Sequence, residues 1–499
     1  MKRKLNRIIA LLAGTLTLLL FVYLPFHSQP TTAQNSFIGN LPAGYAAYSG
    51  SLTIGKYCTC ATGGITGAPP GPPPCNTTTC FGSSNTRYAW VNTNTVGIRS
   101  AVCDEQRQNI KGLPPCFQLD GDDALVISGS LSPIQNLSYY SFNLYQTLAY
   151  NEASSSKYTP IEASVNLGIN NSNLKQGANG KYILILAANS NTINVTKQAL
   201  QATGVPDAII NTYLVPASVA NLGNSSYPEQ LSLLLRLTAQ SDTERQQVNT
   251  FLKQTPSSTA VIFIKGPGKT GDLTFDNLPK WEDTIRANSL EYRLGLDQNL
   301  AELERNIKLK YAQQGYRLKA RIPEKLIHVE PNQCRSTSKA CVFDSPDALY
   351  TSFPCDFSPG QVRNGNCQIT LAANSDDIVM WVGVDHTLVG QKTLATYWSG
   401  ESQGFRQGND GTFSFVGLYT QGSAKQYMRP SKAHNLYAVK ITRNCGQQPY
   451  CAAVPYITGP KDDRTGFIVV GRTYLDKATG SAPNPANLVP SALLWFTKG

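Results

Sequence analysis

The cysteines are the feature that most constrains how this chain can fold. Its 499 residues contain 12 cysteines, six in each half, and none lies between residues 116 and 334. An even number in each half favours disulfides that close locally, which is typical of proteins that fold in an oxidising compartment. The pairing stays open, because six cysteines can pair in many ways. We predict disulfides at Cys58, Cys60, Cys75, Cys80, Cys103, Cys116, Cys334, Cys341, Cys355, Cys367, Cys445 and Cys451.

The N-terminus has the pattern of an export signal. Four bases come first, an apolar run follows, and small residues stand where a signal peptidase cuts: Lys2, Arg3, Lys4 and Arg7, then Ile8 to Phe26, then Thr31 and Ala33. The run is also long enough to remain as a membrane anchor. We therefore expect an exported protein that is periplasmic, extracellular or anchored through this segment.

The remaining sequence favours short strands joined by turns. Tyrosine, glycine and proline are abundant, with 24, 40 and 30 residues. Alternation of apolar and polar residues predicts strands at Ala124–Ser128 and Tyr139–Tyr145. Helices are expected near Asn194–Gly204 and from Ser241, which has capping-box spacing to Glu244. We predict an α+β fold, mostly β, with two disulfide-stapled halves of sandwich or jelly-roll type.

An amphipathic helix joins these two halves in our prediction. Over residues 281–314, apolar side chains recur at spacings of three and four, and Gly295 and Gly315 indicate a weak break and a stop. We expect its apolar face to pack between the halves. The predicted segments are a signal peptide or anchor (1–33), a β-rich domain with two short helices (34–278), the amphipathic helix with a basic linker (279–325) and a second β-rich, cysteine-containing domain (326–499).

Positive charge is concentrated beside this helix. The formal net charge is +11, and loss of the four signal bases leaves 11 − 4 = +7. From Arg305 to Lys325 there are seven bases and one acid, Glu324. A basic patch outside the cytoplasm favours an anionic lipid, a glycan or another envelope component as partner, whereas nucleic acid is not expected there. A solvated helix face followed by a soluble linker explains the same bases.

One stretch matches a catalytic motif. Gly400-Glu-Ser402-Gln-Gly404 fits G-x-S-x-G, the nucleophile elbow of α/β-hydrolases, in which a strand-to-helix turn exposes the serine. Asp410 and His434 follow in the chain order of that triad. The residues after Gly404 indicate a turn and not a helix, which favours an ordinary hairpin loop.

Metal and cofactor motifs are weak. Asp120, Asp122 and Asp123 form an acidic cluster that could hold Ca²⁺, but the remaining ligands of such a loop are missing, which favours a plain turn before the strand. His386 follows Asp385, which could orient it as a base, although a structural histidine is the simpler interpretation. Residues 266–270 mimic a phosphate loop but lack its first glycine. We expect no cofactor.

Three elements resemble a pattern in bacterial envelope proteins of unknown function. They are Asp122–Gly129, Tyr139–Tyr145 and the later strand Gly180–Ile185. Residues 472–480 resemble the closing segment of uncharacterised exported bacterial proteins. The regions to which these segments belong, and over which the resemblance extends, make up about a third of the chain. The resemblance implies a jelly-roll-like domain and an envelope location, and it supplies no reaction or catalytic residues.

Two functions follow as hypotheses from these patterns. The first is an exported, non-catalytic, envelope-associated binding or structural protein of unknown ligand. The alternative is a secreted serine hydrolase that acts on esters or glycans through Ser402 and His434. The sequence does not indicate the oligomeric state.

Overall fold

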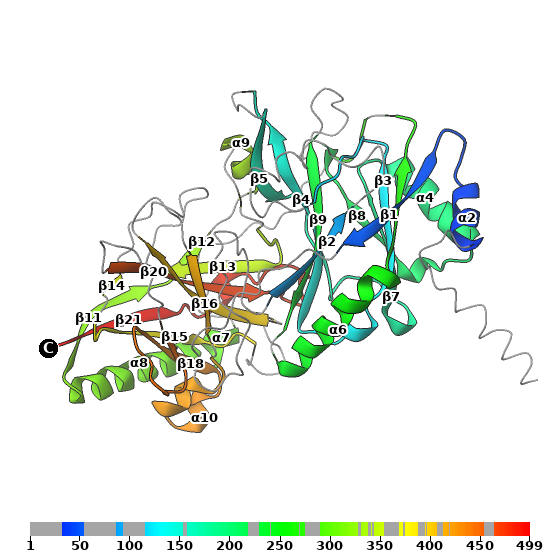
Figure 1. The fold of residues 1–499 in the computed structure, drawn as a ribbon. Helices are drawn as coiled ribbons and strands as arrows, with labels where there is room; N and C mark the ends of the chain where they lie inside the picture. Colours follow the sequence, from blue (N-terminus) through cyan, green and yellow to red (C-terminus); the bar gives the residue numbers. More distant parts are fainter. Residues whose placement is uncertain are drawn as a thin grey trace, which may run out of the picture.

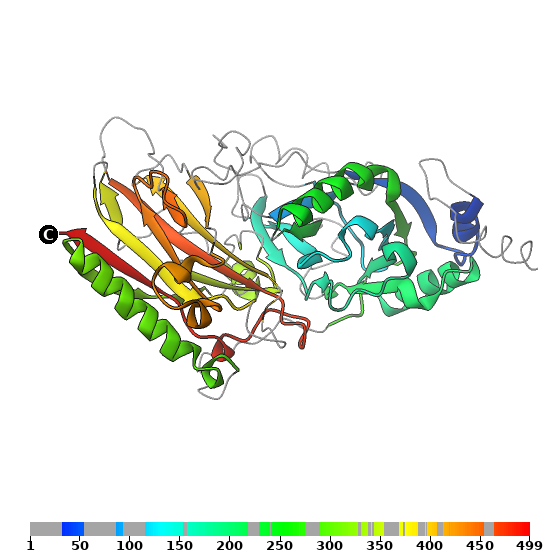
Figure 2. The ribbon, with the colours of Figure 1, turned by 90° about the horizontal axis from the view of Figure 1, so that it is seen from below.

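We describe the protein from a computed structural model of the chain. The described residues are 32–53, 86–92, 115–152, 157–217, 229–239, 241–268, 270–274, 290–327, 331–337, 341, 344–353, 369–372, 375–387, 395, 397–406, 413–418, 420–453 and 464–499. Within them the chain is mostly β, with few helices, and the strands of its two halves form separate sheets that lie side by side (Figures 1 and 2). Among these residues, no helix combines the length and the apolar character needed to cross a bilayer.

The first half contains one 10-stranded sheet with the order β5-β4-β9-β2-β1-β10-β3-β7-β8, and β6 pairs with β4. Both predicted strands are present, and each is longer than expected. The strands are β1 (Ala46–Thr53), β2 (Thr86–Asn92), β3 (Ala124–Ser130), β4 (Tyr139–Tyr150), β5 (Tyr158–Ser164), β6 (Ile169–Asn170), β7 (Lys181–Ala187), β8 (Ile210–Leu214), β9 (Gln230–Thr238) and β10 (Ala260–Lys265).

The core of this half follows from side-chain alternation along the strands. Leu125 and Ile127 of β3 share a core cluster with Leu233 of β9, although these strands lie apart in the sheet order. The residues between them, such as Val126, face the other way and pack with Leu200 of helix α4 (Ser190–Ala202). Since β3 and β7 are buried on both faces of the sheet, their sequences are nearly continuous runs of apolar residues.

The helices of this half begin and end where the local chemistry allows. The Asn189 side chain caps α4 by accepting bonds from two backbone N–H groups, and Gly204 adopts a positive φ of 86° just after the helix. In α6 (Asp242–Ser258), the Ser241 hydroxyl accepts the Glu244 N–H, as the capping box predicts. The Glu244 carboxylate accepts hydrogen bonds from the backbone N–H and the hydroxyl of Ser138. A short helix, α2 (Thr32–Gly39), contacts α4.

The second half contains two sheets. A 5-stranded sheet has the order β11-β21-β15-β18-β19, and a 6-stranded sheet has the order β12-β13-β20-β16-β17, with β14 paired to β20. The strands are β11 (Tyr316–Pro323), β12 (Lys325–Ile327), β13 (Ala348–Phe353), β14 (Thr370–Ala372), β15 (Ile378–Val384), β16 (Tyr397–Arg406), β17 (Phe413–Leu418), β18 (Leu436–Thr442), β19 (Cys451–Ala453), β20 (Arg464–Tyr474) and β21 (Ala492–Lys498).

The amphipathic helix is α8 (Leu296–Gln313), and it covers one face of the 5-stranded sheet (Figure 2). Its buried residues Leu303 and Ile307 share a core cluster with Met380 of β15 and Phe496 of β21. The expectation that this face packs between the halves is therefore wrong. Gly295 and Gly315 have positive φ angles of 67° and 81°, and they separate α8 from α7 (Leu290–Arg293) and from β11, as predicted.

The halves meet through buried polar groups. The Asp344 carboxylate accepts the Ser164 backbone N–H at 2.8 Å, and the Asp344 carbonyl accepts the Tyr145 hydroxyl at 2.7 Å. The Asp347 carboxylate accepts the Tyr139 hydroxyl at 2.9 Å and the Asn170 amide at 3.2 Å. Burial raises the pKa of Asp347 to about 6. Asp344 and Asp347 thus join strands β4, β5 and β6 of the first half to the second half by hydrogen bonds.

Disulfides are present, and they close locally. Cys334–Cys341 joins α9 (Pro331–Thr337) to the segment after it, with the two Cα atoms 5.8 Å apart. Cys445–Cys451 joins the loop that follows β18 to the start of β19, with a Cα separation of 5.6 Å. Cys116 is also disulfide-bonded. These bonds indicate an oxidising compartment. The other seven cysteines lie outside the described residues.

Leu303 and Leu309 of α8 allow a matched test of this packing. Leu303 is fully buried, whereas Leu309 is 58% exposed on the same helix. We expect Leu303→Ala to lower the free energy of unfolding by about 2–5 kcal/mol, because it removes buried methyl groups and leaves a cavity. Leu309→Ala should change it by about 0.5 kcal/mol or less. Denaturant unfolding of the two variants measures the difference, and equal losses would contradict this placement of α8.

Candidate functional site

Ser402 lies inside a strand. The whole G-x-S-x-G stretch is part of β16, and Ser402 pairs with Val416 of β17 and Val469 of β20. A nucleophile elbow requires a strand-to-helix turn, whereas here the strand continues to Arg406. The prediction of a hairpin loop at this stretch is also wrong, because these residues lie within the strand.

His434 is exposed at the end of α10 (Pro430–Ala433), where its Nδ1 lies 2.7 Å from the Asn435 side-chain oxygen. The structure describes the backbone of Ser402, which continues β16. Asp410 lies outside the described residues. The geometry therefore adds nothing to the hydrolase hypothesis.

The acidic cluster is occupied by groups of the protein itself. Asp123 is buried, and its carboxylate accepts the Gly266 N–H at 3.0 Å, the Asp120 N–H at 2.7 Å and the Lys265 ammonium at 3.1 Å. Lys265 also pairs with Asp120. These donors take the place that a cation would need, and in the described residues no cluster of three or more His, Cys, Asp or Glu side chains could hold a metal. The turn interpretation accounts for Asp120 and Asp123, and Asp122 lies beside the Gly266–Gly268 loop.

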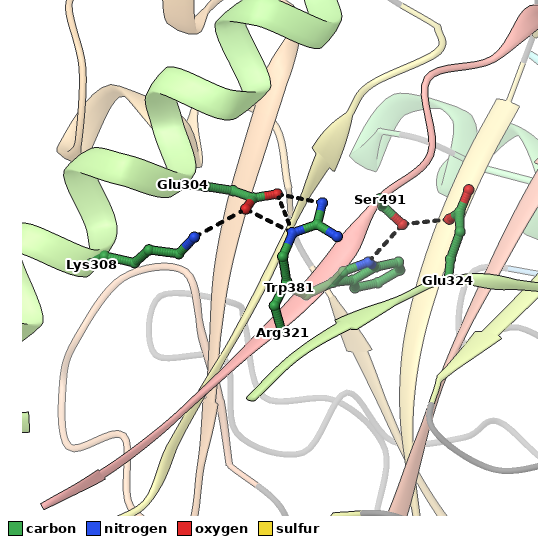
Figure 3. Close-up of polar contacts among 6 residues, drawn as sticks. All are labelled: Glu304, Lys308, Arg321, Glu324, Trp381 and Ser491. Atoms are coloured by element: carbon green, nitrogen blue, oxygen red, sulfur yellow. Dashed lines mark hydrogen bonds and ion pairs between the residues drawn. The ribbon is translucent and has the colours of Figure 1, made fainter. Parts of the chain in front are cut away.

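The basic stretch lies on α8 and on β11, which is an edge strand within the described sheet. Arg321 pairs with the buried Glu304 through three contacts of 2.8–3.2 Å, and Lys308 lies 3.5 Å from the same carboxylate (Figure 3). The Lys319 ammonium stacks 3.6 Å from the Trp495 ring centre, at a bulge in β11. Charges and a bulge also prevent an edge strand from pairing with another chain. Several of these bases therefore have structural roles.

A pocket of about 180 Å³ opens in the second half, and none of the catalytic or metal candidates taken from the sequence line it except His386. It lies where the two sheets meet, between β12, β13 and β20 of one sheet and β15 and β18 of the other. Its polar lining includes Glu324, His386, Ser491 and Tyr437, and its apolar lining includes Trp381, Leu326, Leu349 and Leu488. Its lining therefore combines polar and apolar side chains, as a site for a small polar molecule requires.

His386 is oriented by Glu291. Its Nδ1 lies 2.7 Å from Oε1 of Glu291, which is fully buried on α7. The neighbouring Asp385 does not orient the ring, because its carboxylate accepts from the backbone and hydroxyl of Thr387. Burial lowers the pKa of His386, but the attraction of Glu291, Glu324 and Asp385 outweighs this and leaves that pKa above its usual value. Nε2 of His386 has no hydrogen-bond partner among the described residues.

Glu324 occupies the corner where the chain leaves β11 and enters β12, and so passes from one sheet to the other. Its N–H donates to the Ser491 carbonyl at 3.1 Å, and the Ser491 hydroxyl donates to Oε2 at 2.5 Å (Figure 3). Trp381 Nε1 donates to the same hydroxyl at 3.2 Å. Burial raises the pKa of Glu324. Oε1 of Glu324 has no hydrogen-bond partner in the described part of the chain.

The side chains that line the pocket thus include one carboxylate oxygen and one imidazole nitrogen without a hydrogen-bond partner in the described part of the chain. An imidazole held by a carboxylate is also the arrangement of a general base. However, no hydroxyl or thiol of the described residues hydrogen-bonds to His386, and the Ser491 hydroxyl is already bonded to Glu324 and Trp381.

Sequence reasoning identified only His386 of this site, and it named the wrong partner for it. Glu291, Glu324, His386 and Ser491 lie 33 to 200 positions apart along the chain. Glu324 was visible in the sequence as the single acid in a basic stretch, but that pattern does not indicate a pocket.

Comparison with known proteins adds little. No family model and no curated protein matches the chain. Among solved structures, an uncharacterised protein from Burkholderia cenocepacia is 10% identical, with a TM-score of 0.37 and coverage of 93% of this chain and 85% of that one. A Vibrio parahaemolyticus protein is 12% identical, with a TM-score of 0.31 and coverage of 78% and 90%. The chain is thus similar to bacterial proteins, at a level that carries no argument about its function.

The Glu291–His386 pair should make stability depend on pH. Because folding raises the pKa of His386, its stabilising contribution is complete below the unfolded pKa of about 6.5 and disappears as pH rises through the folded pKa. We expect His386→Gln to remove this loss of stability above about pH 6.5, as measured by unfolding at a series of pH values. His434→Gln, at an exposed histidine, is the control and should retain it. An unchanged pH profile in His386→Gln would refute the role of the pair.

Proposed function

We propose that this chain is a non-catalytic binding protein that takes a small ligand in the pocket between Glu324 and His386. One observation carries the proposal: Glu324 Oε1 and His386 Nε2, which have no hydrogen-bond partner among the described residues, belong to side chains that line one 180 Å³ pocket. Both side chains line the pocket, so a ligand there can replace solvent as the hydrogen-bond partner of these atoms.

The neighbouring side chains support binding more than covalent chemistry. Ser491 is 4% exposed, and its hydroxyl is fixed by Glu324 and Trp381, so it is not activated by His386. Activation of a serine nucleophile needs a base within hydrogen-bonding reach. Fixed, buried side chains of this kind instead give a pocket that keeps its shape without ligand.

We extend the proposal to the setting of the protein. The disulfides support export, and we propose an envelope-associated location in which each half is a β-sandwich and the α8 segment connects them along the chain. The exposed bases Arg305 and Arg317 remain the proposed contact for an anionic lipid, glycan or other envelope component. Ionic-strength dependence of binding to the envelope fraction tests that contact.

The pocket is tested by filling it. Native mass spectrometry of the full protein, purified from its host without denaturation, and a thermal-shift screen of small polar molecules should identify a ligand. At about 100 times its Kd, a ligand that binds only the folded state stabilises it by about 2.7 kcal/mol. We expect this shift to disappear in Leu488→Trp, which places a ring in the pocket.

The matched control is Leu309→Trp, which places the same ring on an exposed position of α8 and should keep the shift. Because Leu488→Trp adds bulk to a buried position, circular dichroism checks that this variant is folded. Ligand shifts of equal size in both variants would exclude the pocket as the binding site. The absence of any ligand in both assays would exclude the binding function itself.

A further inference from the structure

We infer that the ligand carries a compact cation, an alkylammonium or alkylguanidinium group, which binds against the Glu324 carboxylate. This inference rests on the proposed binding function and names the chemical class of the ligand. It is drawn from three features of the pocket: its charge, its free hydrogen-bonding groups and its size.

The charges around the pocket are mostly negative. Glu324 and His386 are the charged side chains that line it in the described part of the chain, and no lysine or arginine does so. Glu291 lies behind His386 on α7, and the carboxylate of Asp385 lies beside it in the same loop. The imidazole is balanced by Glu291, with which it pairs directly. The carboxylates that remain after this pairing give the pocket a negative electrostatic potential, which favours a cation.

The hydrogen-bonding groups also favour a donor of positive charge. A carboxylate only accepts hydrogen bonds. Ser491 satisfies Oε2 of Glu324, and Oε1 has no partner within the described residues. Hydrogen bonds from a charged donor to a carboxylate are about twice as strong as neutral ones. An anionic ligand would instead be repelled by the nearby Glu324 carboxylate.

The size and the walls of the pocket limit the rest of the ligand. A volume of 180 Å³ equals the liquid volume of about six water molecules at about 30 Å³ each. Leucine side chains at 326, 349 and 488 provide an apolar wall suited to a short alkyl stem. Trp381 and Tyr437 also line the space, and aromatic rings attract cations. A cation on a stem of a few carbons matches this space.

Such a group has two sources, a free small amine or guanidine, and the side chain of a lysine or arginine in a peptide. Calorimetry on the full chain with four probes tests the class and separates the sources. The probes are n-butylammonium, n-butylguanidinium, the neutral n-butylurea of similar shape, and N-acetylarginine amide. We expect n-butylguanidinium to bind at least about tenfold more tightly than n-butylurea. Comparable affinity for N-acetylarginine amide identifies a peptide side chain as the source, and its exclusion identifies a free cation.

Glu324→Gln should abolish the preference for the cation, since glutamine keeps the acceptor for Ser491 but removes the charge. Glu152→Gln removes an exposed carboxylate from the first half and should retain the preference. Equal affinity for n-butylguanidinium and n-butylurea in the unmodified protein would overturn the inference, as would a preference that survives Glu324→Gln. If a different ligand binds and Leu488→Trp blocks it, the cation inference fails while the binding function stands.

Discussion

The buried carboxylate of Glu291 organises the candidate site. Both of its oxygens are used, one by His386 Nδ1 and the other by the Val489 N–H at 2.6 Å. It therefore joins three segments that are distant in sequence: α7, the loop after β15 and the loop before β21. Two of these segments supply walls of the pocket, since His386 and Leu488 line it. Removal of one partner from a buried pair of this kind leaves an uncompensated charge, which is strongly destabilising.

The second constraint is the corner at Glu324. The chain passes there from the 5-stranded to the 6-stranded sheet, and the backbone bond to Ser491 fixes the corner against the start of β21. Arg321, three residues earlier, binds the buried Glu304 of α8 (Figure 3). The same short segment thus attaches the helix on one side and forms the pocket on the other. The single acid of this basic stretch therefore lines the pocket, whereas Arg321 binds Glu304 and Lys319 stacks on Trp495.

Local patterns in the sequence predicted local structure well. Gly295 and Gly315 bound α8 because positive φ is accessible to glycine, and the spacing of Leu303 and Ile307 gave the buried face correctly. What that face contacts was mispredicted, because amphipathic spacing says that a helix buries one side and not which sheet covers it. Ser402 shows the same limit: the G-x-S-x-G spacing occurs within an ordinary strand, and only backbone geometry separates it from an elbow.

The sequence by itself determined the mostly β character, the locally closed disulfides Cys334–Cys341 and Cys445–Cys451 and the end of α8 before Gly315, since each depends on residues within a few positions of one another. Only the tertiary structure decided the candidate site. Glu291 and His386 are 95 positions apart, and Ser491 and Glu324 are 167 apart. No local preference relates residues at such distances, and the packing of two sheets brings them together. The pocket exists because the chain changes sheets at Glu324, and that corner is a property of the fold as a whole.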